Sequence, residues 1–251
     1  RNVGIDFSRG SYITFLDADD YLSESYLEHM VNCIEASSAD VVIGNMYKVG
    51  VSGTIVGFQD RIDKEAVISS DIAMEQCLYE RYLSPSVCGK MFRREVWASE
   101  KFPCNCVLAE DVWTLYNVLR VVENVALCKK AVYYAYQREG SAQRSEFSPQ
   151  KIAALDVCEK IMEDAYQNSR LGIYQAAIAK MVAVSFHILL QLPDNTFAGY
   201  RDRCWQGIKK YRSIVMLDTK TKIKTRGACL LSYIGEGVMK GVFALLQRAK
   251  G

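Results

Sequence analysis

The spacing of hydrophobic positions changes sharply after residue 16, and the change predicts a strand that ends in an acidic turn. Residues 12–16 form an apolar run rich in β-forming side chains, and Asp17, Asp19 and Asp20 follow it. We interpret the run as a buried strand that delivers these acids to its carboxyl end, the edge of an open α/β sheet at which ligands bind. The plainer alternative is a strand followed by an Asp-rich turn and a helix N-cap.

The positions up to residue 146 alternate between strand-like and helical patterns, which is typical of an α/β domain. Ser25–Glu28 has the form of a capping box, and Ser70 is placed to cap a later helix. The expected elements are helices at 24–36, 70–82 and from 110, strands at 41–44, 125–127 and 131–136, a hairpin or irregular excursion at 46–68, and a strand-to-helix junction at 91–97.

From residue 147 onward the apolar positions follow a helical period. Ser148 at an N-cap with Pro149 at the first helical position begins the first of these helices. The chain is therefore expected to divide into an α/β domain over 1–146 and a helical C-terminal region over 147–251. The helices are expected at 149–168, 171–191, 197–212 and 226–248.

Residues 220–250 combine an apolar face with positive charge. Lysines and arginines precede and follow the apolar stretch 228–246. An amphipathic helix with basic flanks suits contact with a membrane surface. A helix packed on its own domain is the equal alternative.

Composition narrows the classes of function. The formal net charge is +2 over 251 residues, and no basic block is interleaved with aromatic residues, so nucleic acid is not an expected partner. Among nine cysteines, Cys104 and Cys106 have no partner pair at zinc spacing. We expect free thiols in a reducing cytoplasm. The sequence contains no uninterrupted apolar run of about 18 residues, so we expect no membrane-spanning helix.

The acids themselves predict chemistry. Three carboxylates this close repel one another unless a cation or strong hydrogen-bond donors compensate. A hard divalent metal that itself holds phosphate oxygens is the natural counter-charge. Glu110 and Asp111 form a second acidic pair at a helix start, where a favourable interaction with the helix dipole is their structural alternative.

Two other acidic motifs fit less well. A phosphatase with an Asp nucleophile requires Gly and then Thr or Val after the second Asp, where Asp20 and Tyr21 stand. A calcium-binding EF-hand loop requires an acid and a glycine at the positions of Tyr21 and Leu22.

Four sequence elements occur in a distinctive order. A further segment, Cys88–Glu95, lies among them, and in this segment Lys90 precedes a hydrophobic pair and basic residues. The four elements are Arg1-Asn2-Val3-Gly4, the Asp17–Asp20 cluster, Glu110–Asp111, and Tyr133-Tyr134-Ala135-Tyr136 followed by Arg138 and Gly140-Ser141. Over residues 1 to about 146, this order resembles the family 2 glycosyltransferases of the GT-A fold, bacterial enzymes that build capsule, lipopolysaccharide or wall polymers.

The resemblance implies an α/β fold with a partial, Rossmann-like GT-A mixed sheet, followed by an α-helical C-terminal region. It implies a metal-dependent, inverting transferase that moves a sugar by single displacement from a nucleotide-diphosphate sugar to a hydroxyl of a growing cell-surface glycan. The donor would most commonly be a UDP-sugar, the acceptor a glycan or lipid-linked chain, and the cofactor Mn²⁺ or Mg²⁺. The expected location is cytoplasmic, with peripheral contact at the inner face of the cytoplasmic membrane left open.

The resemblance also implies roles for the acids. Asp19 would be the metal ligand that bridges the cation to both phosphates. Asp17 would contact the ribose or support the metal shell, and Asp20 would belong to the same substrate site. Asp111 would be the general base, with Glu110 beside it to orient the acceptor or the loop.

Basic and polar residues complete the expected site. Arg1 would approach the nucleotide, and Arg138 and Ser141 would close over the diphosphate. Lys90 is either a substrate contact or a structural ion-pair partner. Trp97 and Trp113 are expected in the core, or at best as a sugar-stacking platform.

The family's opening strand and second β-α unit would lie before residue 1. We therefore expect an N-terminal part of the catalytic domain to be missing, and this chain alone to be inactive or poorly folded. The alternative from another class is a non-catalytic relative that acts as a binding or scaffold protein in a polysaccharide-synthesis complex.

Overall fold

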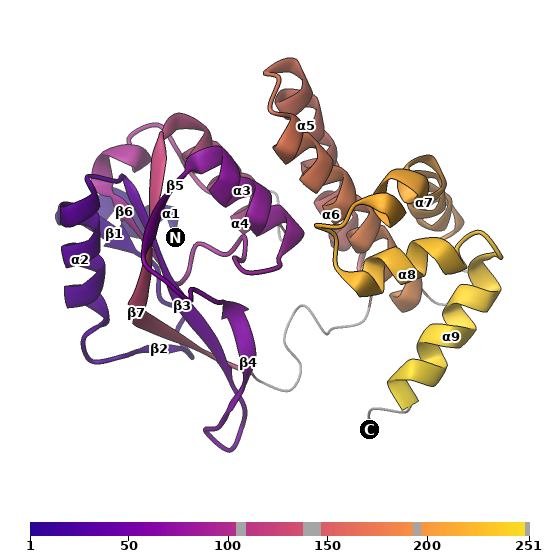
Figure 1. The fold of residues 1–251 in the computed structure, drawn as a ribbon, viewed down its shortest axis with the longest axis horizontal. Helices are drawn as coiled ribbons and strands as arrows, with labels where there is room; N and C mark the ends of the chain where they lie inside the picture. The colour runs from indigo at the N-terminus through magenta and orange to yellow at the C-terminus, as the bar shows by residue number, and fades with distance from the viewer. Residues whose placement is uncertain (104–108, 138–146, 193–196, 249–251) are drawn as a thin grey trace. The chain divides into compact units, whose positions relative to one another are not determined.

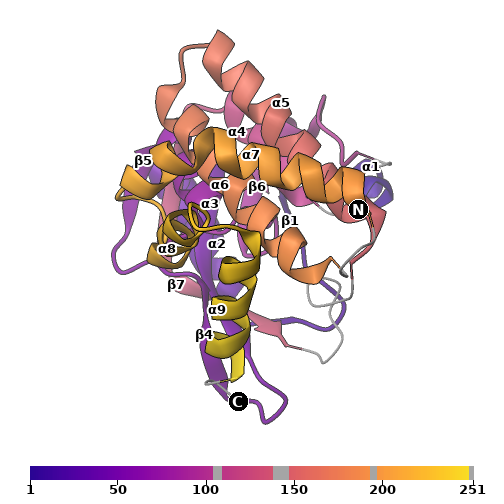
Figure 2. The same cartoon turned by 90° about the vertical axis from the view of Figure 1, so that its right-hand side faces the viewer.

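The computed structural model describes residues 1–103, 109–137, 147–192 and 197–248, with side chains up to residue 243. The chain divides into two compact units, Arg1–Ser145 and Glu146–Gly251. The first is built on a mixed sheet with helices and the second is helical (Figures 1 and 2). The predicted α/β class is confirmed.

One mixed sheet organises the first unit. In the described residues its strands lie in the order β1-β6-β3-β7-β2, while β4 pairs with β3 and β5 with β7. β3 and β7 run parallel, and the other pairings between these strands are antiparallel. The strands are β1 (Tyr12–Thr14), β2 (Tyr21–Leu22), β3 (Val41–Val49), β4 (Ile55–Asp60), β5 (Ala66–Ser69), β6 (Lys90–Arg93) and β7 (Asn124–Tyr136).

Helices cover both faces of this sheet (Figure 1). On one face α2 buries Tyr26, Met30 and Ile34 against residues of β3 and β7, among them Met46 and Tyr133. On the other face α3 and α4 pack together. The helices are α1 (Asn2–Phe7), α2 (Tyr26–Ser37), α3 (Ser70–Tyr79), the 3₁₀ turn η1 (Arg94–Trp97) and α4 (Glu110–Val121).

Two strands differ from their predicted extent. β1 ends at Thr14, and Leu16 is 50% exposed, so the apolar run leaves the sheet before the acids begin. The two short strands expected at 125–127 and 131–136 are one continuous strand, β7. A register irregularity opposite Gly44 and Asn45 lets β7 continue where the pattern of alternation is interrupted.

Two predicted helix caps are wrong. Ser25 stands at the N-cap of α2, but its side chain makes no capping hydrogen bond, so the capping box is not formed. Ser69, not Ser70, caps α3, because its Oγ accepts from the backbone N–H of Ile72 at 3.3 Å. α3 ends before Tyr82, since Glu80 adopts the left-handed conformation that terminates helices.

The second unit packs its helices around α6, which contacts α5, α7 and α8. Contrary to the expectation from sequence, α6 is long and apolar enough to cross a membrane. However, 61% of its most apolar stretch is buried inside the protein, as in a core helix. The helix expected at 226–248 is two helices, separated where Gly235 adopts φ 131°. The elements are η2 (Pro149–Ile152), α5 (Ala153–Gln167), α6 (Leu171–Gln191), α7 (Ala198–Leu217), α8 (Ile223–Leu231) and α9 (Glu236–Arg248).

Candidate functional site

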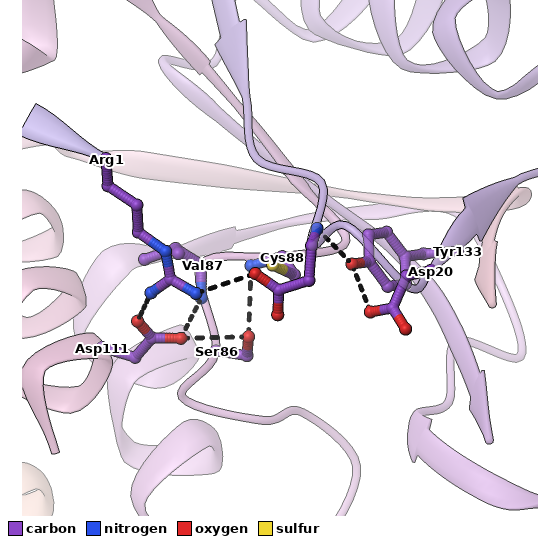
Figure 3. Close-up of polar contacts among 8 residues, drawn as sticks. Arg1, Asp20, Ser86, Val87, Cys88, Asp111 and Tyr133 are labelled. Atoms are coloured by element: carbon purple, nitrogen blue, oxygen red, sulfur yellow. Dashed lines mark hydrogen bonds and ion pairs between the residues drawn. The ribbon is translucent and has the colours of Figure 1, made fainter. Parts of the chain in front are cut away.

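The guanidinium of Arg1 connects the two acidic segments (Figure 3). Its Nη2 donates to Oδ1 of Asp17 at 3.1 Å, and its Nη1 donates to Oδ1 of Asp111. Burial lowers the pKa of Arg1, but the two carboxylates outweigh burial and hold this pKa above its ordinary value. Arg1 therefore remains charged and holds the acidic turn against the start of α4.

Asn2 and Phe102 position Arg1. The Asn2 side-chain amide donates to the carbonyl oxygen of Phe102 and accepts from its backbone N–H, both at 2.9 Å. The Arg1 guanidinium also lies over the Phe102 ring, 5.3 Å from its centroid. These contacts give a physical role to the Arg-Asn pair that the sequence singled out.

Asp111 lies in the first turn of α4, where the helix dipole favours a carboxylate. Its Oδ2 accepts from Ser86 Oγ at 3.2 Å and from the backbone N–H of Val87 at 3.3 Å. The same Ser86 hydroxyl accepts from the backbone N–H of Cys88 at 3.2 Å (Figure 3). The turn before β6 thus fixes the orientation of the expected base.

The acidic turn itself is held by β7. The Tyr133 hydroxyl donates to Oδ2 of Asp20 at 2.6 Å and accepts from the backbone N–H of Asp17 at 3.2 Å. The backbone N–H of Tyr136 donates to Oδ1 of Asp20 at 2.8 Å. Both Asp20 oxygens therefore accept protein hydrogen bonds, which makes Asp20 a residue that shapes the turn.

Burial perturbs two of the site carboxyl groups. Burial raises the pKa of Asp20, and the hydrogen bonds from Tyr133 and Tyr136 oppose this rise. Burial also raises the pKa of Glu110, as does the neighbouring Asp111 carboxylate.

The acidic turn fits a metal that takes most of its ligands from a substrate. Within the described residues, no group of three or more His, Cys, Asp or Glu side chains could hold an ion by itself. Asp17 is paired with Arg1, Asp20 is bonded to β7, and Asp19 is partly exposed between them. Mg²⁺ is commonly bound through one or two carboxylates plus substrate phosphates, and the turn offers this donor set.

Lys90 lies outside this site. It is fully buried, and its Nζ donates to the Ser84 carbonyl at 3.0 Å and lies 3.6 Å from Oδ2 of Asp60. Ser84 also donates to Asp60 through its hydroxyl at 3.0 Å. In this structure the expected substrate contact is therefore a structural ion pair, the second of its two predicted roles.

Arg138 and Ser141, expected over the diphosphate, lie outside the described residues. Three residues that sequence reasoning missed are Ser86, Phe102 and Tyr133, which position the acids. Tyr133 stood within a singled-out motif, but only strand pairing shows that its hydroxyl reaches the acidic turn. Ser86 carried no signal in the sequence beyond its place in a turn.

Residues 1–98 match the model of the family described as glycosyl transferase family 2. The glycosyltransferase GlyA of Streptococcus pneumoniae is 27% identical over 192 residues, which are 74% of this chain and 27% of GlyA. The poly(ribitol-phosphate) β-N-acetylglucosaminyltransferase TarS of Staphylococcus aureus is 27% identical over 182 residues, 68% of this chain and 30% of TarS.

A crystal structure of TarS 1–349 in complex with UDP-GlcNAc has a similar fold. It superposes with a TM-score of 0.68 over 92% of this chain and 70% of that structure, at 18% identity. The chain spans less than a third of the length of GlyA and of TarS. On this evidence residues 1–98 resemble glycosyl transferase family 2, and the chain has the GT-A fold of the TarS structure.

Proposed function

We propose that this chain forms part of an enzyme that transfers a sugar from a nucleotide-diphosphate sugar to a hydroxyl of a cell-surface glycan, with inversion and with a divalent metal. The observation that carries the proposal is the bridge from Asp17 through Arg1 to Asp111. It brings the acidic turn, suited to a metal-bound diphosphate, next to a carboxylate held at a helix start.

The arrangement suits a single in-line displacement. Asp111 accepts the proton of the acceptor hydroxyl, whose oxygen forms a bond to the anomeric carbon as the bond from that carbon to the diphosphate oxygen breaks on the opposite face. Attack from the opposite face inverts the anomeric centre. Arg1, which stays charged, donates hydrogen bonds at the same place and stabilises negative charge there.

Asp19 would hold the metal, Asp17 would support the metal shell or contact the ribose, and Asp20 would keep the turn in shape. When bound, Mn²⁺ or Mg²⁺ would neutralise the charge that develops on the departing diphosphate. Glu110 lies next to the base in the first turn of α4 and would orient the acceptor.

We propose a UDP-sugar as the donor. The TarS structure holds UDP-GlcNAc, and several relatives are named for adding sugars to poly(ribitol phosphate). A polymer of the cell envelope is therefore the proposed class of acceptor.

Calorimetry tests the donor site. The full product of the source gene should bind UDP and UDP-sugars only when Mn²⁺ is present, and Asp19→Ala should abolish this binding. Asp63→Ala, an exposed carboxylate in an ion pair with Arg61, is the control and should bind as the unchanged protein does. A folded protein that binds no nucleotide with metal would contradict the transferase and favour the scaffold alternative.

We also propose a cytoplasmic location with peripheral contact to an anionic membrane through α8 and the segment before α9. Ile223, Leu230 and Ile234 are 81%, 61% and 69% exposed there, and the exposed Lys222 and Lys224 flank Ile223. Apolar side chains beside lysines suit anionic lipid headgroups. Flotation with phosphatidylglycerol vesicles, but not with phosphatidylcholine vesicles, is the expected result, and Ile223→Asp should prevent it.

A further inference from the structure

Four aromatic residues form one row across the sheet. Tyr21 of β2 pairs with Tyr134 of β7, Tyr134 pairs with Tyr47 of β3, and Tyr47 pairs with Phe58 of β4. Direct cross-strand partners point to the same face of a sheet. The ring centroids are 4.7 Å, 5.9 Å and 5.0 Å apart along the row. We call Tyr21, Tyr134, Tyr47 and Phe58 the aromatic row.

The aromatic row faces away from the core under α2. Tyr133, the neighbour of Tyr134 on β7, points into that core, so Tyr134 points to the opposite face. Tyr21 is 46% and Phe58 52% exposed. Grouped aromatic side chains left in contact with water mark a binding surface.

Along the aromatic row the rings meet both face-to-face and edge-to-face, since Tyr21 and Tyr134 are stacked at 16°. Tyr47 stands nearly perpendicular to both Tyr134 and Phe58, at 77° and 88°. In such edge-to-face pairs, the ring that presents its edge keeps its own faces uncovered by that partner. Phenolic hydroxyls of the three tyrosines can also donate and accept hydrogen bonds.

The aromatic row begins at the candidate active site. Tyr21 directly follows Asp20 in the acidic turn. Asp20 in turn accepts a hydrogen bond from the backbone N–H of Tyr136, which lies in β7 together with Tyr134. At the other end the Arg61 guanidinium lies 5.7 Å from the centroid of Phe58. Three strand spacings place the ends of the row about 14 Å apart, longer than one sugar ring.

We propose that the aromatic row binds the acceptor, as a chain of sugar rings that leads from the acidic turn toward β4; this inference rests on the proposed function. The C–H face of a pyranose ring carries slight positive charge and packs on the negative face of an aromatic ring. The sugar hydroxyls at the ring edge remain free for the tyrosine hydroxyls and for water. Trp97, expected in the core or at best as a stacking platform, is only 2% exposed and lies in the core, so it is not available for stacking on a sugar.

Binding of a β-linked N-acetylglucosamine tetramer, followed by NMR titration of the protein, tests the row separately from catalysis. Phe58→Ala and Tyr21→Ala should each weaken tetramer binding about two- to tenfold, while Phe58→Trp retains it. Ile55→Ala, an equally exposed apolar residue of β4, is the matched control and should bind normally. Affinity for UDP with Mn²⁺ should be the same in all of these proteins.

The outcomes separate the two proposals. Equal tetramer binding by the Ala variants and the unchanged protein, or no binding by the unchanged protein, would overturn the aromatic row as the acceptor site. A loss of UDP affinity in Phe58→Ala would overturn it too, because the row would then serve the donor. If the tetramer binds through the row but no nucleotide binds with metal, the row stands and the proposed transfer reaction fails.

Discussion

The hydroxyl of Tyr133 lies 2.6 Å from Oδ2 of Asp20 and 3.2 Å from the backbone nitrogen of Asp17. One side chain of β7 therefore holds both ends of the acidic turn, while its ring is buried in the core under α2. The shape of the turn is linked in this way to the packing of the sheet.

Replacement of Tyr133 by Phe should loosen this turn without opening a cavity. The pKa of Asp20, already raised by burial, should rise further because the hydrogen bond that favours its ionised form is lost. We expect Mn²⁺-dependent UDP affinity to fall about tenfold, the equivalent of roughly one charge-assisted hydrogen bond. Calorimetry measures this UDP affinity. The control is Tyr136→Phe, which keeps the backbone hydrogen bond to Asp20 and should bind UDP normally.

Loss of Arg1 should leave Asp17 and Asp111 facing each other without a cation. We expect Arg1→Ala to lower kcat/KM for the donor about 100-fold, a loss of close to 3 kcal/mol from a group that contacts both acids. Arg1→Lys keeps the charge but not the planar fork, so it should restore only part of the rate. Full activity in Arg1→Ala would show that the bridge has no catalytic role.

Asp111→Asn tests the general base directly. The amide can still accept the Arg1 hydrogen bond but cannot take a proton from a hydroxyl. We expect the rate of sugar transfer to fall by about 10²- to 10⁴-fold, while Mn²⁺-dependent UDP binding stays unchanged. Asp63→Asn, far from the site in sequence and exposed, should transfer normally. A non-catalytic scaffold would tolerate Asp111→Asn without loss of its function.

The buried pair of Lys90 and Asp60 should matter for stability. Both side chains are fully buried, so Lys90→Met leaves the Asp60 carboxylate without its cation. We expect the free energy of unfolding to fall by about 3–5 kcal/mol, measured by urea unfolding with tryptophan fluorescence. Lys101→Met breaks an ion pair with 43% and 58% exposed partners and should cost less than about 1 kcal/mol.

Glu110 should make stability depend on pH. Burial raises its pKa in the folded protein, so the folded state binds this proton more tightly than the unfolded state. Stability from this group is present at low pH and is lost as the pH rises through the folded pKa. Glu110→Gln, which cannot ionise, should therefore raise the melting temperature at pH 7 but not at pH 4. Thermal unfolding across this range checks the sign, and a lower melting temperature at pH 7 would contradict it.

The sequence by itself determined the class of the fold and the identity of the acidic residues. An apolar run that ends in Asp17, Asp19 and Asp20 predicts a strand with a polar end, because periodicity and side-chain charge are local properties. Glu110 and Asp111 were placed at a helix start for the same reason. The strand that carries these acids was overestimated at Leu16, since local hydrophobicity does not show where strand pairing ends.

Only the tertiary structure decided which residues meet. Arg1 reaches Asp111, Tyr133 reaches Asp20, and Lys90 faces Asp60 instead of the site, because strand order and register bring together segments that lie far apart in sequence. The aromatic row has the same origin: Tyr47 and Phe58 carry no signal alone, and pairing of four strands aligns them with Tyr134. Local patterns define elements, whereas a site depends on how those elements pair, and that pairing is set by packing of the whole unit.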